Sequence, residues 1–250
     1  METVASVKKQ LSDTYKYRIE MHAHTKGVSH CGRKTPTEQV EIYHSLGFDA
    51  IVISNHFLNY VDQNGNDYLK GDGKGEKITH FLSGFEEAKK RGDELGITVL
   101  LAAELRFDDS PNDYLLYGVD REVLEKCYDY IPLGLKKMRD ECPLEKSVLI
   151  WAHPKRDGMA ECPVELLDGI EIFNMHPAHN SRIGIATRKA YAEGAKIKTC
   201  GSDCHNDIEG VEGVSALRTK ILPRDSFELA EILRSGEYLF EIGGGTLVLP

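Results

Sequence analysis

The sequence predicts an α/β fold in which a parallel sheet closes into a barrel. Short apolar runs alternate with helical segments along most of the 250-residue chain, in about seven units. A β/α barrel typically needs about 250 residues, so the length fits one such domain. Histidines and acids also follow several of the apolar runs, where a barrel would gather them at one mouth.

The N-terminal half supplies the first units in order. Residues 17–22 form the first predicted strand. Thr35-Pro36-Thr37-Glu38 is a capping box with proline at the first helical position, and it begins a helix that reaches about residue 46. The apolar run 49–54 is a buried strand. Residues 78–95 form a helix that ends at a glycine, and 97–103 form the next strand.

The C-terminal half continues the alternation. Its predicted strands are residues 114–119, 147–152, 169–173 and 195–200. Its predicted helices are 180–193 and 225–234, with further helical material that includes 133–140. Because continuous apolar strands that alternate with helices are typical of parallel sheets covered on both faces, we expect parallel strands throughout.

One segment interrupts this pattern. Residues 59–77 are rich in Gly, Asn, Asp and Lys, and they show no apolar periodicity. The segment follows His56 directly, so it is expected on the same face as the histidines. It is either a solvated surface loop or a mobile lid.

Composition excludes several classes of protein. A net charge of −9 disfavours long nucleic acid and anionic membranes as partners. The chain contains no long apolar run and no apolar signal core, so a cytoplasmic location is expected. The six cysteines form no CxxC pair, and reduced thiols are expected. The sequence leaves the oligomeric state open.

Two histidine-containing pairs point to metal chemistry. Side chains two residues apart on a strand face the same side, so His22 and His24 aim together, as do Asp203 and His205. Imidazole and carboxylate together suit zinc, iron or manganese. Further candidates follow other strands: His56, Glu104 and His153. Gathered at one mouth, these side chains would form a polynuclear site.

Taken together, these motifs resemble the PHP (polymerase and histidinol phosphatase) family. They span residues 17–206, and we interpret the whole chain, 1–250, as one domain. The resemblance implies a distorted (β/α)7, TIM-like barrel with up to three metal ions at the strand carboxyl ends. The motifs are His22-Ala23-His24-Thr25 with His30, residues 47–56, Ala102-Ala103-Glu104, Trp151-Ala152-His153-Pro154, residues 168–174 and Gly201-Ser202-Asp203-Cys204-His205.

The resemblance also implies a set of ligands for two to three divalent ions, Zn, Mn or Fe. The first ion would be held by His22, His24, Glu104 and Asp203. Glu104 would bridge to a second ion, which His153 also binds. The third would be held by His30, His56 and His205.

Two departures from the family pattern affect the second motif and the second ion. Asn55 stands where the family often has Asp, and residues 113–117 contain no histidine where many members have one. The second ion is therefore either weakly held or completed by water.

Several other residues keep two interpretations. Cys31 and Cys204 adjoin proposed ligands, and packing is favoured over thiolate ligation. Glu171 has either a structural hydrogen-bonding role or a catalytic one. His176 and His179 follow a strand and could reach the mouth.

The function predicted from these residues is that of a metal-dependent phosphoesterase, a phosphoric ester hydrolase. A metal-bridging hydroxide would attack a small phosphate ester. Arg33 and Arg182 are the predicted phosphate contacts, with Arg106, Lys155 and Arg156 as further candidates. The alternatives are a metal-dependent amidohydrolase and a non-catalytic, metal-stabilised interaction domain. The substrate stays open among histidinol phosphate, nucleotides and sugar phosphates.

Overall fold

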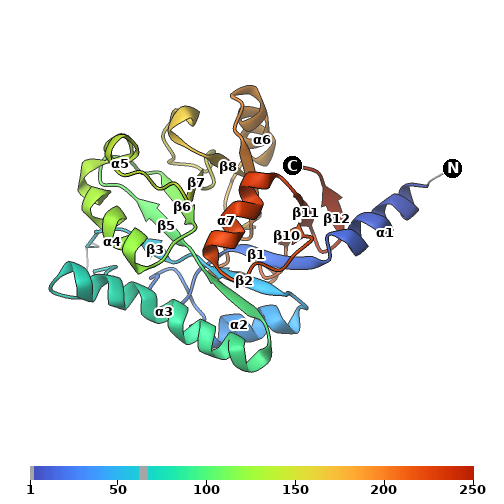
Figure 1. Cartoon of the computed structure of the whole chain (residues 1–250), viewed down its shortest axis with the longest axis horizontal. Helices are drawn as coiled ribbons and strands as arrows, with labels where there is room; N and C mark the ends of the chain where they lie inside the picture. The colour runs from blue at the N-terminus through green and yellow to red at the C-terminus, as the bar shows by residue number, and fades with distance from the viewer. Residues whose placement is uncertain (1–2, 62–66) are drawn as a thin grey trace.

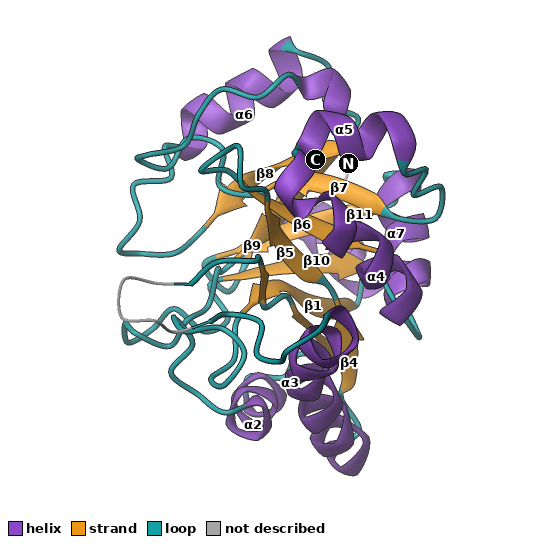
Figure 2. Cartoon of the chain, turned by 90° about the vertical axis from the view of Figure 1, so that its left-hand side faces the viewer, coloured by secondary structure: helices purple, strands orange, loops and turns teal. Residues whose placement is uncertain are grey.

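The computed structural model describes residues 3–61 and 67–250, and these form a mixed α/β fold. Two six-stranded sheets lie at its centre, with helices around them (Figures 1 and 2). The first sheet has the order β12-β11-β10-β1-β2-β4 and the second β3-β5-β6-β7-β8-β9.

The strands are short, and most are buried on both faces. Those of the first sheet are β1 (Tyr17–Ala23), β2 (Ala50–Ile53), β4 (Thr98–Leu101), β10 (Ser215–Thr219), β11 (Tyr238–Ile242) and β12 (Thr246–Val248). Those of the second sheet are β3 (His56–Phe57), β5 (Ala103–Arg106), β6 (Asp113–Tyr117), β7 (Val148–Trp151), β8 (Gly169–Asn174) and β9 (Ile197–Gly201).

Five of the described helices, α2, α3, α5, α6 and α7, follow the predicted positions with small shifts at their ends, whereas α1 was not predicted. They are α1 (Val4–Thr14), α2 (Pro36–Ser45), α3 (Lys74–Leu95), α4 (Arg121–Tyr130), α5 (Leu135–Glu141), α6 (Ile183–Ala192) and α7 (Ser226–Ser235). Two single 3₁₀ turns, Ile131–Leu133 and Val164–Leu166, complete them. None of the described helices combines the length and the apolar composition that a membrane span requires.

The predicted closed barrel is not found among the described residues, because the strands divide into two sheets. The sheets nevertheless meet. The Ala102 N–H donates to the Ile53 carbonyl and the Glu104 N–H to the Asn55 carbonyl, so β2 and β4 lead directly into β3 and β5. A bridge between Ala23 and Cys204 joins the end of β1 to the segment after β9. The two sheets are therefore joined by backbone hydrogen bonds.

The expectation of parallel strands throughout is wrong. β6 is antiparallel to both β5 and β7, and β10 is antiparallel to β1 and β11. Only residues 107–112 separate β5 from β6, which is too short for the crossover of a dozen or more residues that a parallel connection needs. The amino end of β6 consequently lies beside the carboxyl ends of β5 and β7.

The predicted capping box is present at α2. The Thr35 hydroxyl accepts the Glu38 N–H at 3.2 Å, and the Glu38 carboxylate accepts the Thr35 N–H at 2.8 Å. Within the predicted loop 59–77, residues 62–66 lie outside the described residues. The described remainder is tied down where Lys77, already in α3, donates to the Asn59 side chain at 3.1 Å and pairs with Asp67.

Candidate metal centre

The proposed ligands converge although they come from both sheets. Long loops gather at one side of the strands, on the left of Figure 2. The side chains that meet there sit at or just after strand ends: His22 and His24 at β1, His56 in β3, Glu104 in β5, His153 after β7, and Asp203 and His205 after β9. Most of these side chains are fully buried.

The first predicted set has the spacing of ligands around one ion. The His24 Nε2 atom lies 3.2 Å from the His22 Nε2 atom, and 3.3 Å from an oxygen of Glu104 and from one of Asp203. The His22 Nε2 atom lies 3.4 Å from both carboxylates. Tetrahedral metal–ligand bonds of about 2.0–2.1 Å place neighbouring ligand atoms about 3.3 Å apart. His22, His24 and Asp203 therefore fit one divalent ion, and Glu104 lies beside them, where it also groups with His56 and Asp113.

Beside this set lies Asp113, which belongs to the segment 113–117 that lacks the histidine of many PHP-family members. The His153 Nε2 atom lies 3.0 Å from Glu104 Oε1 and 3.7 Å from Asp113 Oδ2. Asp113, His56 and Glu104 also form a group whose ligand atoms lie within 4.8 Å of one another. Sequence reasoning missed Asp113 because it is the first residue of β6, which was assumed to be parallel.

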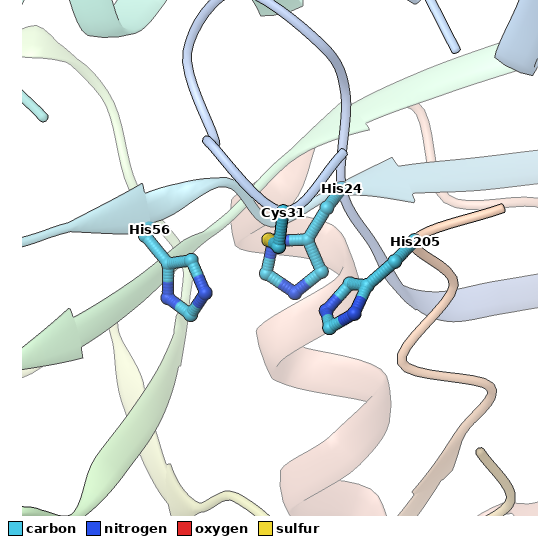
Figure 3. Close-up of side chains that lie close together, drawn as sticks. All are labelled: His24, Cys31, His56 and His205. Carbon is cyan, nitrogen blue, oxygen red and sulfur yellow. The ribbon is translucent and has the colours of Figure 1, made fainter. Parts of the chain in front are cut away.

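The third predicted set is only partly assembled. His56 and His205 are brought together, but the ring of His30 stacks on Tyr68, with centroids 3.9 Å apart. Within the described chain, His30 joins none of the close ligand groups, and Cys31 lies with His24, His56 and His205 instead (Figure 3). The structure thus differs from the sequence-based assignment by one residue.

Hydrogen bonds around the ligands fix which histidine nitrogens face the site. Glu171 accepts from the Nδ1 atom of His22 at 2.9 Å and from the backbone N–H of His153 at 2.9 Å. The Ser29 hydroxyl donates to Asn55, so it accepts from the Nδ1 atom of His24 at 3.2 Å. Both histidines consequently turn the Nε2 atom, and not Nδ1, toward the site.

Protonation also favours metal binding. Burial raises the pKa of Glu104, but His56 and His22 outweigh it and hold this pKa well below its usual range. Burial likewise raises the pKa of Asp203, and His22 outweighs it, so that this pKa is also lowered. Burial lowers the pKa of His24 to about 3. At neutral pH, two ionised carboxylates therefore face a neutral imidazole.

Several buried polar atoms in this region lack a hydrogen-bond partner in the described chain. They are His56 Nδ1, Glu104 Oε2, His153 Nδ1 and His205 Nε2, although the first two lie 2.9 Å apart. Such atoms are costly unless something else satisfies them. The backbone is strained as well, since His153 and Asp203 have φ of 29° and 51°. Strained, unsatisfied groups of this chemistry fit bound divalent cations.

The predicted phosphate contacts lie further out. The Arg33 side chain is exposed, and Arg182 precedes α6, where it donates to the Lys155 carbonyl and pairs with Asp157. Their role stays a prediction. Arg156 lies closer to the ligands: its guanidinium is 3.4 Å from Asp203 Oδ2 and 3.2 Å from Asp113 Oδ2.

The two further histidines differ in position. The His179 Nδ1 atom lies 3.4 Å from Asp203 Oδ2, so this side chain reaches the mouth. His176 stacks against His179 and is held by Asp207, 3.1 Å away.

Comparisons with known proteins bear on the fold. No protein-family model matches the chain, and no curated protein matches it significantly. A solved two-domain protein from Bacteroides vulgatus, containing a predicted PHP-like metal-dependent phosphoesterase, superposes with a TM-score of 0.60 at 17% identity over 91% of this chain. The chain has a PHP-like fold. It spans 65% of the length of that two-domain protein.

Two other solved structures show weaker likeness. A putative metal-dependent phosphoesterase from Bifidobacterium adolescentis gives a TM-score of 0.45 at 16% identity, covering 75% of this chain and 87% of its own. An amidohydrolase from Chromobacterium violaceum gives 0.29 at 18% identity, covering 49% and 33%. Of these three solved structures, the Bacteroides protein is the one that superposes well enough to support the PHP-like fold.

Proposed function

We propose that this chain is a metal-dependent phosphoesterase that hydrolyses a small phosphate ester. The observation that carries the proposal is the spacing of His22, His24 and Asp203, whose ligand atoms form one compact group, with Glu104 oxygens 3.3–3.4 Å from both histidine Nε2 atoms. A divalent ion bound there lowers the pKa of a coordinated water and neutralises charge on phosphate oxygens.

The charge of the mouth supports a requirement for ions. Glu104, Asp113 and Asp203 are all buried there, with Glu171 directly behind. A phosphate ester would meet this concentration of negative charge as a like charge. Divalent cations reverse the sign of the mouth, so substrate binding is expected to depend on them.

Arg156 is the cation best placed to hold a phosphate oxygen. Its guanidinium lies between Asp113 and Asp203, and the side chain keeps 18% of its surface exposed. Arginine matches phosphate with two parallel N–H donors. We therefore assign Arg156 to phosphate binding ahead of Arg33 and Arg182, whose side chains are exposed.

The test begins with elemental analysis of the purified protein, followed by a phosphate-release screen over metabolite esters with Mn, Fe or Zn. Phosphate release that chelation abolishes and metal restores is expected. Asp203→Asn should lose nearly all of it, because this side chain contacts both His22 and His24. The surface variant Asp140→Asn serves as the control.

Three results would contradict the proposal. Full turnover in excess chelator, with the metal confirmed absent, would exclude metal-dependent hydrolysis. Release of ammonia from amides without phosphate release would indicate an amidohydrolase. Unfolding on metal removal, together with no hydrolysis of any ester, would indicate a metal-stabilised interaction domain.

A further inference from the structure

Cys31 is positioned by a loop that is fixed at both ends. Asn55 holds the beginning, since its Oδ1 atom accepts from the Thr25 N–H at 2.8 Å and from the Ser29 hydroxyl at 2.9 Å. The end is held where the Arg33 N–H donates to the His205 carbonyl at 2.9 Å. Cys31 therefore keeps a defined place beside His205.

Gly32 makes this loop possible. A Cβ atom at this position would lie 2.5 Å from the Thr25 carbonyl carbon and 2.8 Å from the Lys26 nitrogen. Real Cβ atoms do not approach backbone so closely, so any other residue would displace the loop. The close crossing turns Cys31 toward the histidines (Figure 3). Its neighbour His30 stacks on Tyr68 instead.

The group around Cys31 contains four potential ligands, and its three histidines each belong to another ligand group as well. His24 lies within 4.8 Å of the thiol together with His56 and His205, yet its Nε2 atom is also 3.2–3.4 Å from His22, Glu104 and Asp203. Its other nitrogen is hydrogen-bonded to Ser29. One lone pair binds one ion, so His24 belongs to the first set.

We propose that Cys31, and not His30, completes the third metal site with His56 and His205, and that the Cys-His₂ set leaves a coordination position open to substrate. This inference rests on the proposed function and deepens it. Three protein ligands with one open position are typical of catalytic zinc, whereas four are typical of structural zinc. A soft thiolate also favours zinc over manganese or magnesium.

The hydrogen bonding of His205 in this cluster also supports a bound ion. The His205 Nε2 atom is buried and makes no hydrogen bond within the described chain, although Asp203 Oδ1 lies 3.0 Å away. His205 is itself 8% exposed. A buried ring nitrogen without a hydrogen bond, on a histidine grouped with a thiol and two further imidazoles, is the arrangement that a soft divalent ion would satisfy.

Cobalt reports the thiolate directly. The whole protein is stripped with chelator under reducing conditions, reloaded with Co²⁺, and its near-ultraviolet absorption measured for the thiolate-to-cobalt charge-transfer band. The wild-type protein should show the band. Cys31→Ser should lose it and bind about one ion fewer per chain. Gly32→Ala, which keeps the thiol but displaces the loop, should weaken it.

Two matched variants and one measurement without mutation complete the test. His30→Ala and Cys142→Ser should keep the band, because neither side chain joins the cluster. In the wild-type protein, zinc should protect Cys31 from iodoacetamide when the alkylated peptides are counted.

A band that persists in Cys31→Ser, or that disappears in His30→Ala, would overturn the assignment. So would equal alkylation of Cys31 with and without zinc. These outcomes leave metal-dependent phosphate release untouched, whereas failure to bind any metal or to release phosphate would remove the proposed function itself.

Discussion

At the scale of single residues, the site depends on side chains that touch no substrate. Glu171 accepts hydrogen bonds from the His22 ring, the His153 backbone and the Asn174 amide. It thereby holds β1, β8 and the residue after β7 in register with one another. A carboxylate behind a ligating histidine also raises the basicity of that ligand.

Glu171→Gln tests this support. The amide keeps the size of the side chain but turns an NH₂ group toward groups that already donate. We expect metal affinity to fall about 10- to 100-fold, as for other outer hydrogen-bond partners of metal ligands. Competition with a fluorescent chelator measures it, with the exposed Glu165→Gln as control. An affinity equal to that of the control would contradict the role.

Arg156 and Arg182 provide a second comparison. If Arg156 contacts phosphate through charge-assisted hydrogen bonds, Arg156→Ala should lose about 1.5–3 kcal/mol of transition-state stabilisation. Its kcat/KM then falls roughly 10- to 150-fold. Arg156→Lys should recover only part, because a point charge lacks the planar fork.

Arg182→Ala is measured in parallel at unchanged metal content. Since Arg182 pairs with Asp157 on the surface, it should change kcat/KM by little. A loss larger than that of Arg156→Ala would place the phosphate contact at Arg182, as the sequence predicted.

At the scale of elements, the sequence predicted the alternation well and the strand directions less well. Most strands and helices between β1 and α7 lie close to their predicted ranges, because apolar runs and helix caps are local signals. Direction depends on pairing partners distant in sequence, so the antiparallel β6 was missed, and with it Asp113 at the mouth. α1, β10, β11 and β12 were also not predicted.

Contacts between residues distant in sequence also explain why the structure places Cys31, and not His30, in the ligand cluster. The resemblance to the PHP family assigned His30 as a ligand, and the structure brings its neighbour Cys31 into the cluster. Which of two adjacent side chains turns inward depends on the crossing at Gly32, a contact with Thr25 that sequence spacing does not contain.

Two helices carry the same cap and should respond differently to its loss. Thr35→Ala removes the capping box of α2, whose buried face includes Val40 and Tyr43. It should lower the free energy of unfolding by about 1 kcal/mol. The melting temperature then falls by about 2–4 °C for a chain of this size.

Thr3→Ala removes the equivalent box from α1, which projects from the body in Figure 1 and buries no residue. Fraying of α1 should leave the main unfolding transition nearly unchanged. Calorimetry of both variants measures the two melting temperatures. An equal fall in both variants would contradict the prediction and show that α1 unfolds together with the body.

At the scale of the whole molecule, the ligand cluster is also the junction of the two sheets. His22 and His24 belong to the first sheet, and Glu104 and His56 to the second. An ion bound between them would cross-link the fold. Ligands that bind only the folded state stabilise it by mass action, by about 2.7 kcal/mol at a hundred times the dissociation constant.

Without metal, the same charges should make stability depend on pH. The pKa values of Glu104 and Asp203 are lowered from 4.5 and 3.8 in the folded state, so their contribution is present above these values and is lost as pH falls. Three carboxylates raise the pKa of His22 well above 6.5 against the opposing effect of burial, so its contribution is present below 6.5 and is lost as pH rises.

The chelated protein should therefore be most stable between about pH 4.5 and 6.5. On the acid side, each lowered carboxyl contributes a slope of up to about 1.4 kcal/mol per pH unit. Denaturant midpoints of the metal-free protein across this range measure the curve. Asp203→Asn should flatten both limbs, because it removes one lowered carboxyl and one of the charges that keep His22 protonated. An unchanged pH profile in that variant would show that these charges are not coupled as the geometry indicates.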